Sequence, residues 1–511
     1  MEEVAHILTN ADPPALPKVV PAPARLGRRI LTAGSIYGLT NFGVRGINFL
    51  LLPIISRFLR PADYGIVALA DSIAGPIGMI CGLGAATSLR RMYYEYDDPA
   101  QTRAYVGTAL RFVMLSTIAM AVLSSLVGPQ MLKALDKHFV VPFFPLLAIA
   151  IVTAGLGQVE QTQLSIFQVQ NRPQAVAAMS VSVFGIGMIS LGWLVVWSRM
   201  GALGVLTSRL IAVICSVLIT VYVSRGFLSA RWDWRSLREH LRLGVPLALF
   251  EVVNLGLLFA DRLILQYYRP MDEVGIYSVA YTFGLLMLTL TLSLSQAWSP
   301  LFFESARRGN VTELKHTSSA LIAGLVAIAT FGVIIAGPTI HVILDPRYAA
   351  AAPLVPLILG AYLLNSFYYL FELVAIQNKR IGVIVIVTII ACAGNIALNL
   401  WWVPLWGAWG ATFATVAAYL VQAALLYTVL RPQAENLYSK SALFANLAIF
   451  TCVLAAVELP WSSAARPFIL SAALIIAMAL LWPLGLKRVV GEVCSAVSSI
   501  RDCWSQQASP Q

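Results

Sequence analysis

Long apolar runs, separated by short breaks that contain charged residues, proline or glycine, occupy most of the 511-residue chain. A helix needs about 20 mostly apolar residues to cross the hydrocarbon core of a bilayer, and each run is close to that length. The pattern predicts about 14 transmembrane helices, at 30–55, 64–89, 105–127, 141–169, 174–197, 201–223, 244–267, 275–302, 317–344, 353–376, 382–403, 408–430, 441–459 and 467–486.

Composition and charge support a membrane protein. Hydrophobic residues make up 59% of the chain and charged residues 12%, against about 25% charged in soluble domains. The net charge of +11 would raise the question of nucleic acid in a soluble protein. Here 23 of the 35 Lys and Arg residues fall on the N-terminal side of the predicted layout, eight on the other side and four in or beside spans. The positive-inside rule accounts for this bias without nucleic acid, and it predicts that both termini are cytoplasmic.

An internal repeat divides the predicted helices. The segment 60–66 recurs at 269–276, 170–172 recurs at 377–380, and 201–204 recurs at 407–410. Each half has an even number of spans, so the halves have the same orientation and are related by an axis along the membrane normal. We therefore expect a disordered cytoplasmic arm at 1–29, six-helix halves at 30–224 and 244–431, a basic cytoplasmic linker at 225–243, a helix pair at 441–486 and a cytoplasmic tail at 487–511.

Polar residues inside the predicted spans are the candidate site. A charge at mid-bilayer costs about 2.5–3.5 kcal/mol, so such residues usually face a cavity or a partner. We expect a polar cavity lining composed of Asn41, Asn48, Gln158, Gln161, Ser165, Gln168, Asn254, Tyr362, Asn365 and Tyr369. The alternative for any one of them is a polar bridge between packed helices.

The intramembrane charges suggest two chemistries. Arg45 and Arg262 are candidates to bind a diphosphate, because a guanidinium presents a fork of donors that suits phosphate oxygens. Glu251, Asp261 and Glu372 are candidates to take up a proton or a sodium ion as the coupling ion. Asp261 and Arg262 could instead form a structural ion pair. Motifs for ATP hydrolysis or metal binding are absent from the sequence, so we expect no cofactor.

Several segments resemble a known family. The segments 243–247, 260–265 and 273–281 are similar to the central signature of bacterial polysaccharide-biosynthesis and O-antigen flippases, the Wzx-type lipid-linked oligosaccharide exporters of the MOP superfamily. Asn395, Asn399 and the segment 404–415 resemble that family's junction between helices 11 and 12, and 60–69 resembles its entry to helix 2. The resemblance extends over residues 28–431.

This resemblance implies an all-α, MATE-like polytopic fold in the bacterial cytoplasmic (inner) membrane. It implies a flippase, not an enzyme, that moves undecaprenyl-diphosphate-linked oligosaccharide repeat units for exopolysaccharide, O-antigen or lipopolysaccharide export by alternating access. Its partners would be the membrane-embedded lipid-linked oligosaccharide, a polysaccharide polymerase and the export machinery. Two alternatives stay open: a MATE-like ion-coupled drug or metabolite antiporter, and a membrane polysaccharide polymerase or glycosyltransferase.

Overall fold

The computed structural model describes residues 52–96, 98–134, 141–228, 231–437, 439–458, 466–481 and 487. Within these residues all regular structure is helical. In this described part of the chain, eleven helical segments are long and apolar enough to cross a membrane, and they correspond to the second to twelfth predicted spans. Two shorter apolar helices, Leu443–Val457 and Ala472–Leu481, correspond to the predicted final pair. The predicted all-α polytopic class is confirmed. Of the first predicted span, 30–55, residues 30–51 lie outside the described part of the chain.

The chain forms two compact units. The first comprises the described residues up to Ser278 together with Ile396–Ala408, and the second comprises Val279–Asn395 with the described residues from Trp409 onward. These units reflect contacts, whereas the predicted halves reflect a sequence repeat, so the predicted division at 225–243 stays a prediction.

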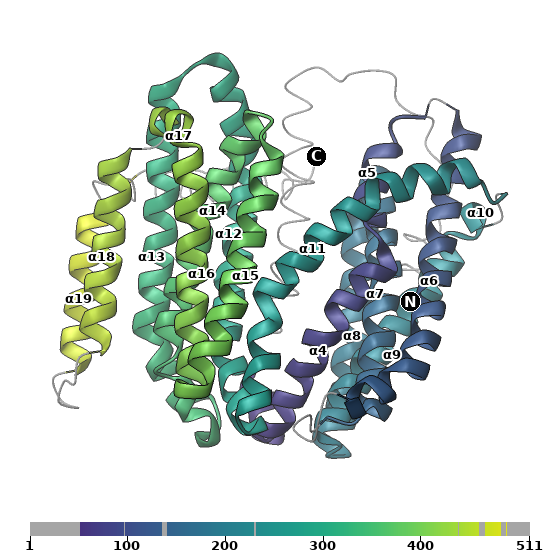
Figure 1. The fold of residues 1–511 in the computed structure, drawn as a ribbon, viewed down its shortest axis with the longest axis horizontal. Coiled ribbons are helices and arrows are strands. Elements are labelled where there is room, and N and C mark those ends of the chain that lie inside the picture. Colours follow the sequence, from purple (N-terminus) through teal and green to yellow (C-terminus); the bar gives the residue numbers. More distant parts are fainter. Residues whose placement is uncertain are drawn as a thin grey trace, which may run out of the picture. The chain divides into compact units, whose positions relative to one another are not determined.

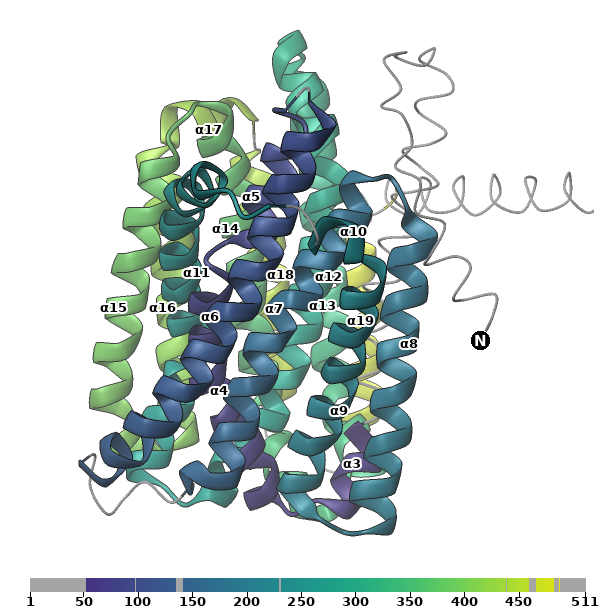
Figure 2. The same cartoon turned by 90° about the vertical axis from the view of Figure 1, so that its right-hand side faces the viewer.

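Helices of the first unit are α3 (Leu52–Phe58), α4 (Pro61–Gly82), α5 (Ala85–Met92), α6 (Pro99–Ala134), η1 (Phe143–Leu147), α7 (Ala148–Val169), α8 (Pro173–Leu191), η2 (Gly192–Trp197), α9 (Gly201–Val223), α10 (Arg225–Leu228) and α11 (Trp234–Tyr268). Helix α7 packs against α4, α6 and α9, and α8 lies beside α9 (Figure 2). Small residues allow the close approach of α4 and α7, because a Cβ on Gly78 would stand 2.9 Å from the Ala154 carbonyl oxygen.

The second unit contains most of α12 (Met271–Arg308), α13 (Val311–Ile343), η3 (Pro346–Ala351), α14 (Val355–Gln377), most of α15 (Ile381–Trp406) and α16 (Ala408–Val429), then α17 (Arg431–Leu437), α18 (Lys440–Glu458) and α19 (Arg466–Leu481). Helix α13 packs against α14 and also against the C-terminal pair α18 and α19, drawn in yellow in Figure 1. The final helix pair is therefore part of this unit.

Two copies of the sequence repeat lie against each other within the first unit. The start of α4 and the start of α12 approach so closely that a Cβ on Gly65 would collide with the Met271 carbonyl oxygen, and a Cβ on Gly275 with the Pro61 carbonyl oxygen. Asp272 Oδ1 also accepts a hydrogen bond from the Ala62 amide at 3.1 Å. The contact is reciprocal because the two glycines occupy equivalent positions of the repeat.

Side chains from the same repeat fix the ends of two further helices. Arg269 donates to the carbonyl oxygens of Pro404 and Leu405 at 3.1 and 3.3 Å, near the C-terminus of α15. Glu273 accepts from the Ala408 amide at 2.7 Å, at the first residue of α16. A cation at a helix C-terminus and an anion at an N-terminus both complement the helix dipole. Gly407, between the two helices, has a φ of +56°, which glycine adopts without strain.

Helix boundaries differ from the predicted ones at several ends, and two of these differences have a clear local cause. The predicted span 64–89 is two helices, α4 and α5, which are separated at Leu83 and Gly84 by positive φ angles. Helix α11 begins at Trp234, ten residues before the predicted start of its span. Asp233 explains the early start, because its carboxylate accepts hydrogen bonds from the amides of Arg235 and Ser236 at 3.1 and 3.0 Å. The Ser236 hydroxyl also donates to this carboxylate and lowers the pKa of Asp233 below its ordinary value.

Candidate functional site

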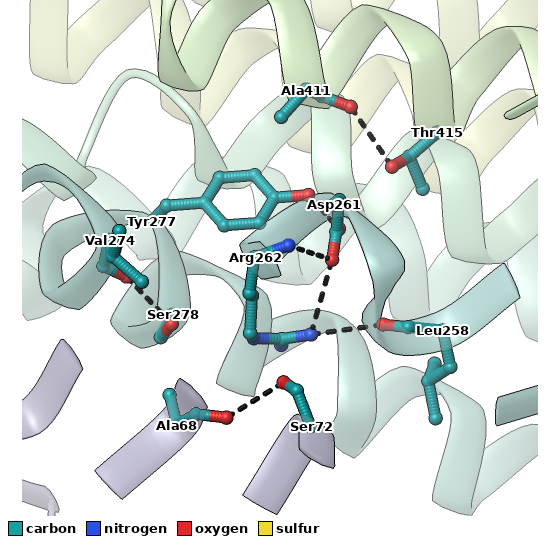
Figure 3. Close-up of polar contacts among 10 residues, drawn as sticks. All are labelled: Ala68, Ser72, Leu258, Asp261, Arg262, Val274, Tyr277, Ser278, Ala411 and Thr415. Carbon is teal, nitrogen blue, oxygen red and sulfur yellow. Dashed lines mark hydrogen bonds and ion pairs between the residues drawn. The ribbon is translucent and has the colours of Figure 1, made fainter. Parts of the chain in front are cut away.

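Two consecutive charged residues of α11 are buried inside a membrane span. Asp261 and Arg262 are 1% and 3% exposed. Figure 3 shows the carboxylate of Asp261 between the guanidinium of Arg262 and the ring of Tyr277 from α12. Arg262 Nη1 lies 3.5 Å from Asp261 Oδ1, and the Tyr277 hydroxyl donates to Asp261 Oδ2. We call these three residues the α11 triad.

The geometry of the triad explains how neighbours along a helix form an ion pair. Consecutive helical side chains diverge, so they do not normally meet. Here the Arg262 side chain turns back one helical turn, and Nη1 donates to the Leu258 carbonyl oxygen at 2.9 Å (Figure 3). The guanidinium carbon lies 5.1 Å from the ring centre of Phe259 and 5.9 Å from that of Tyr277. Ring faces and a carbonyl oxygen thus supply part of the stabilisation that water would give.

The other predicted residues of α11 do not join the triad. Glu251 is exposed and Asn254 is half-buried. Ten residues separate Glu251 from Asp261, which corresponds to about 15 Å along a helix. The third predicted coupling carboxylate, Glu372, belongs to the second unit and is half-buried. Of the three predicted coupling carboxylates, Asp261 is therefore the one that belongs to the triad.

The predicted polar stripe of α7 is not a uniform surface. Ser165 is buried, Gln158 and Gln168 are half-buried, and Gln161 is exposed. Gln168 accepts a long hydrogen bond, 3.5 Å, from Arg90 of α5. A shorter glutamine hydrogen bond on α7 belongs to Gln163, which the sequence pattern did not single out. Its Oε1 atom accepts from the Ser224 hydroxyl at 2.6 Å, so it joins α7 to the end of α9.

One predicted residue of α14, Asn365, belongs to a buried polar network in the second unit. Tyr362 and Asn365 are buried, and Tyr369 is half-buried. Asn365 donates to Gln422 of α16 at 3.4 Å, and Gln422 donates to Thr388 of α15 at 3.3 Å. Nothing in the sequence could pair these residues, because they lie on three helices.

A second intramembrane ion pair was missed at the sequence level. Arg209 of α9 donates through Nη1 to both oxygens of Asp71 of α4, at 2.9 and 2.8 Å. Both side chains are about half-exposed, at 47% and 44%. In the sequence Arg209 stands as a single charge, because its partner is 138 residues away.

Some predicted site residues fall outside the described part of the chain. These are Asn41, Arg45 and Asn48 of the first predicted span, and their roles stay predictions. Within the described residues, no group of three or more His, Cys, Asp or Glu side chains is arranged to hold a metal ion.

Comparisons with known proteins identify the family and the fold. A family model described as "Polysaccharide biosynthesis protein" matches residues 54–361. Among solved structures, the lipid II flippase MurJ in an inward closed conformation is similar with a TM-score of 0.63 and 12% identity, covering 90% of this chain and 99% of that chain. A multidrug resistance MATE family transporter of the MOP superfamily, in an inward-facing conformation, is similar with a TM-score of 0.61 and 13% identity. That match covers 78% of this chain and 95% of the transporter.

A MOP superfamily transporter from Pyrococcus furiosus is similar with a TM-score of 0.55 and 13% identity, and the match covers 80% of this chain and 96% of that transporter. No curated protein sequence matches the chain at a significant level. At these identities the structural likeness establishes the fold, and the predicted MATE-like architecture is confirmed.

Proposed function

Because the chain belongs to the polysaccharide biosynthesis protein family, we propose that it is a flippase for lipid-linked oligosaccharide repeat units. The family and the fold are those of membrane transporters and flippases of the MOP superfamily. The cargo in this proposal is an oligosaccharide on undecaprenyl diphosphate, destined for an exopolysaccharide or O-antigen. The protein moves it across the cytoplasmic membrane by alternating access, and both termini are cytoplasmic. It catalyses no covalent step.

The observation that carries the proposal is the family match over residues 54–361, more than half of the chain. The similarity to a lipid II flippase over 90% of this chain is consistent with it. A polymerase and the export machinery are the proposed partners, because they would consume the translocated repeat units.

We propose that the α11 triad couples the cargo to an ion. Arg262 is held by Asp261 and by the Leu258 carbonyl oxygen. A cargo diphosphate would compete with the Asp261 carboxylate for the guanidinium, because both are anionic acceptors of the same donors. A proton or sodium ion on Asp261 would weaken its hold on Arg262 and favour the exchange. Binding of the coupling ion would thereby promote binding of the diphosphate.

The remaining predicted residues keep their proposed roles. Arg45 is proposed as the second diphosphate ligand. Glu251 and Glu372 are proposed as additional coupling carboxylates. Glu251→Gln and Glu372→Gln test these two roles when translocation in vesicles, described below, is measured across a range of pH. Unchanged translocation by a variant would remove that residue from the coupling pathway.

Translocation in vesicles tests the proposal directly. Purified protein is reconstituted with a labelled undecaprenyl-diphosphate oligosaccharide, and the label that becomes accessible on the opposite leaflet is measured under defined proton and sodium gradients. We expect translocation by the wild type, severe loss with Arg262→Gln, and retention with the control Arg307→Gln, which changes an exposed arginine at the end of α12. Absence of translocation by well-folded wild type under every gradient would contradict the flippase assignment.

The alternatives make different predictions. A drug or metabolite antiporter of the same fold would export cationic dyes from cells and leave glycan display unchanged after gene deletion. Loss of a flippase should trap complete repeat units in the cytoplasmic leaflet, whereas loss of a polymerase should leave single units exposed on the outer surface.

A further inference from the structure

The first turns of α11 carry a line of exposed arginines. Trp234 is 74% exposed, and Arg235, Arg238 and Arg242 are all exposed. Their spacing of three and four residues puts them on one helix face. Arg231 precedes the helix and is also exposed. We call residues 231–242 the basic segment.

Contacts on the opposite face hold the basic segment in a fixed orientation. His240 is 1% exposed, and its Nδ1 atom lies 2.8 Å from the Ser88 hydroxyl of α5. The Tyr96 hydroxyl donates to Glu239. Ahead of the helix, the Asp233 amide donates to the Thr108 hydroxyl of α6 at 3.2 Å. The basic face therefore points away from α5 and α6.

Three of the four arginines of the basic segment are available for a ligand. Arg235 pairs with Glu239 at 3.1 Å. For Arg231, Arg238 and Arg242, no ion pair occurs with any residue in the described part of the chain. The same helix face then becomes apolar, since Val245 and Leu249 are 36% and 62% exposed. The change from basic to apolar within one turn is the polarity profile of a helix that passes from lipid headgroups into the hydrocarbon.

We propose that the basic segment binds the headgroups of anionic phospholipids at the membrane surface. Arginines attract the anionic leaflet, and tryptophan prefers the interface. The distribution of the charges argues for a lipid surface rather than a single cargo molecule. Arg235 and Arg242 are about 10 Å apart along the helix axis, on the convex surface of one helix, whereas a single diphosphate needs donors that converge. Several monophosphate headgroups match such a line.

Lipid selectivity in nanodiscs tests this inference independently of transport. The full-length protein is placed in nanodiscs of phosphatidylcholine with increasing phosphatidylglycerol, and the phosphatidylglycerol retained on the protein is measured by native mass spectrometry. The test variant is the triple substitution Arg231→Gln, Arg238→Gln and Arg242→Gln. The matched control is Arg307→Gln, Lys379→Gln and Arg380→Gln, which removes three exposed positive charges elsewhere.

We expect wild type and control to retain phosphatidylglycerol in preference to phosphatidylcholine. Each arginine should contribute about five-fold, so the test variant, which lacks three of them, should lose the preference by about two orders of magnitude. Wild-type preference should also fall in 0.5 M NaCl, because salt screens exposed charges. Equal losses in test and control would reduce the effect to net charge and overturn the proposal, as would an unchanged preference in the test variant. Size-exclusion elution at the wild-type volume verifies that both variants are folded.

Discussion

Replacing Asp261 with Asn should destabilise the protein strongly while leaving its shape almost unchanged. The amide is nearly isosteric with the carboxylate, and its oxygen can still accept from the Tyr277 hydroxyl. The negative charge, however, is lost. Arg262 is only 3% exposed, and its guanidinium stays charged at every accessible pH. The variant therefore leaves this cation inside a membrane span and takes away the carboxylate beside it.

The size of the effect follows from the contacts of the triad. Breaking a buried ion pair by removing one partner costs about 3–5 kcal/mol. The Leu258 carbonyl oxygen at 2.9 Å and the two ring faces stay in place, so we expect the lower end, about 3 kcal/mol. The double variant Asp261→Asn with Arg262→Met removes the buried cation as well. Since replacing both members of a buried pair by uncharged groups is often neutral, it should recover most of the loss.

Equilibrium unfolding in mixed detergent and SDS micelles, followed by tryptophan fluorescence, measures these differences. Asp98→Asn is the control, because Asp98 is exposed and accepts from the Ala100 amide at 2.9 Å, a role that asparagine fills equally well. Its free energy of unfolding should match the wild type within about 0.5 kcal/mol. A cost below about 1 kcal/mol for Asp261→Asn would refute the reasoning, and so would a double variant no more stable than the single one.

Three further outcomes are expected. Gly65→Ala should cost about 1–3 kcal/mol of unfolding free energy, because the new Cβ would collide with the Met271 carbonyl oxygen. The control Gly185→Ala should be neutral or stabilising, because the space around Gly185 is open. Equal effects of the two substitutions would contradict the close contact. Arg209→Gln and Asp71→Asn should each lower the thermal midpoint more than the double variant does, and additive losses would argue against their pairing. Asp233→Ala should cost about 1 kcal/mol at pH 7. Because the pKa of Asp233 is lowered in the fold, this contribution is present at neutral pH and is lost on acidification below about pH 4, so a cost that does not shrink at pH 3 would contradict it.

The helices of this protein could be predicted from sequence because the bilayer leaves little choice. Backbone polar groups have no water to bind in the hydrocarbon, so each apolar run of sufficient length must form a helix. In the described part of the chain, eleven helical segments and the shorter pair match the predicted runs, and the order of the segments that resemble the family's signature indicated the family. Hydropathy was less informative at the boundaries. The start of α11 depends on the Asp233 cap and on the burial of His240, neither of which lengthens the apolar run.

Sequence alone also determined which residues carry unusual chemistry, because a charge in an apolar run is visible without a structure. It identified Asp261 and Arg262 and left open whether they pair. Only the tertiary structure decided that they do, since the pairing depends on the Leu258 carbonyl oxygen and on Tyr277 from the next helix. The pair of Asp71 and Arg209 and the contact of Gly65 with Gly275 likewise needed the fold. Helical periodicity specifies the face on which a side chain lies, whereas the partner that meets that face is set by how distant helices pack.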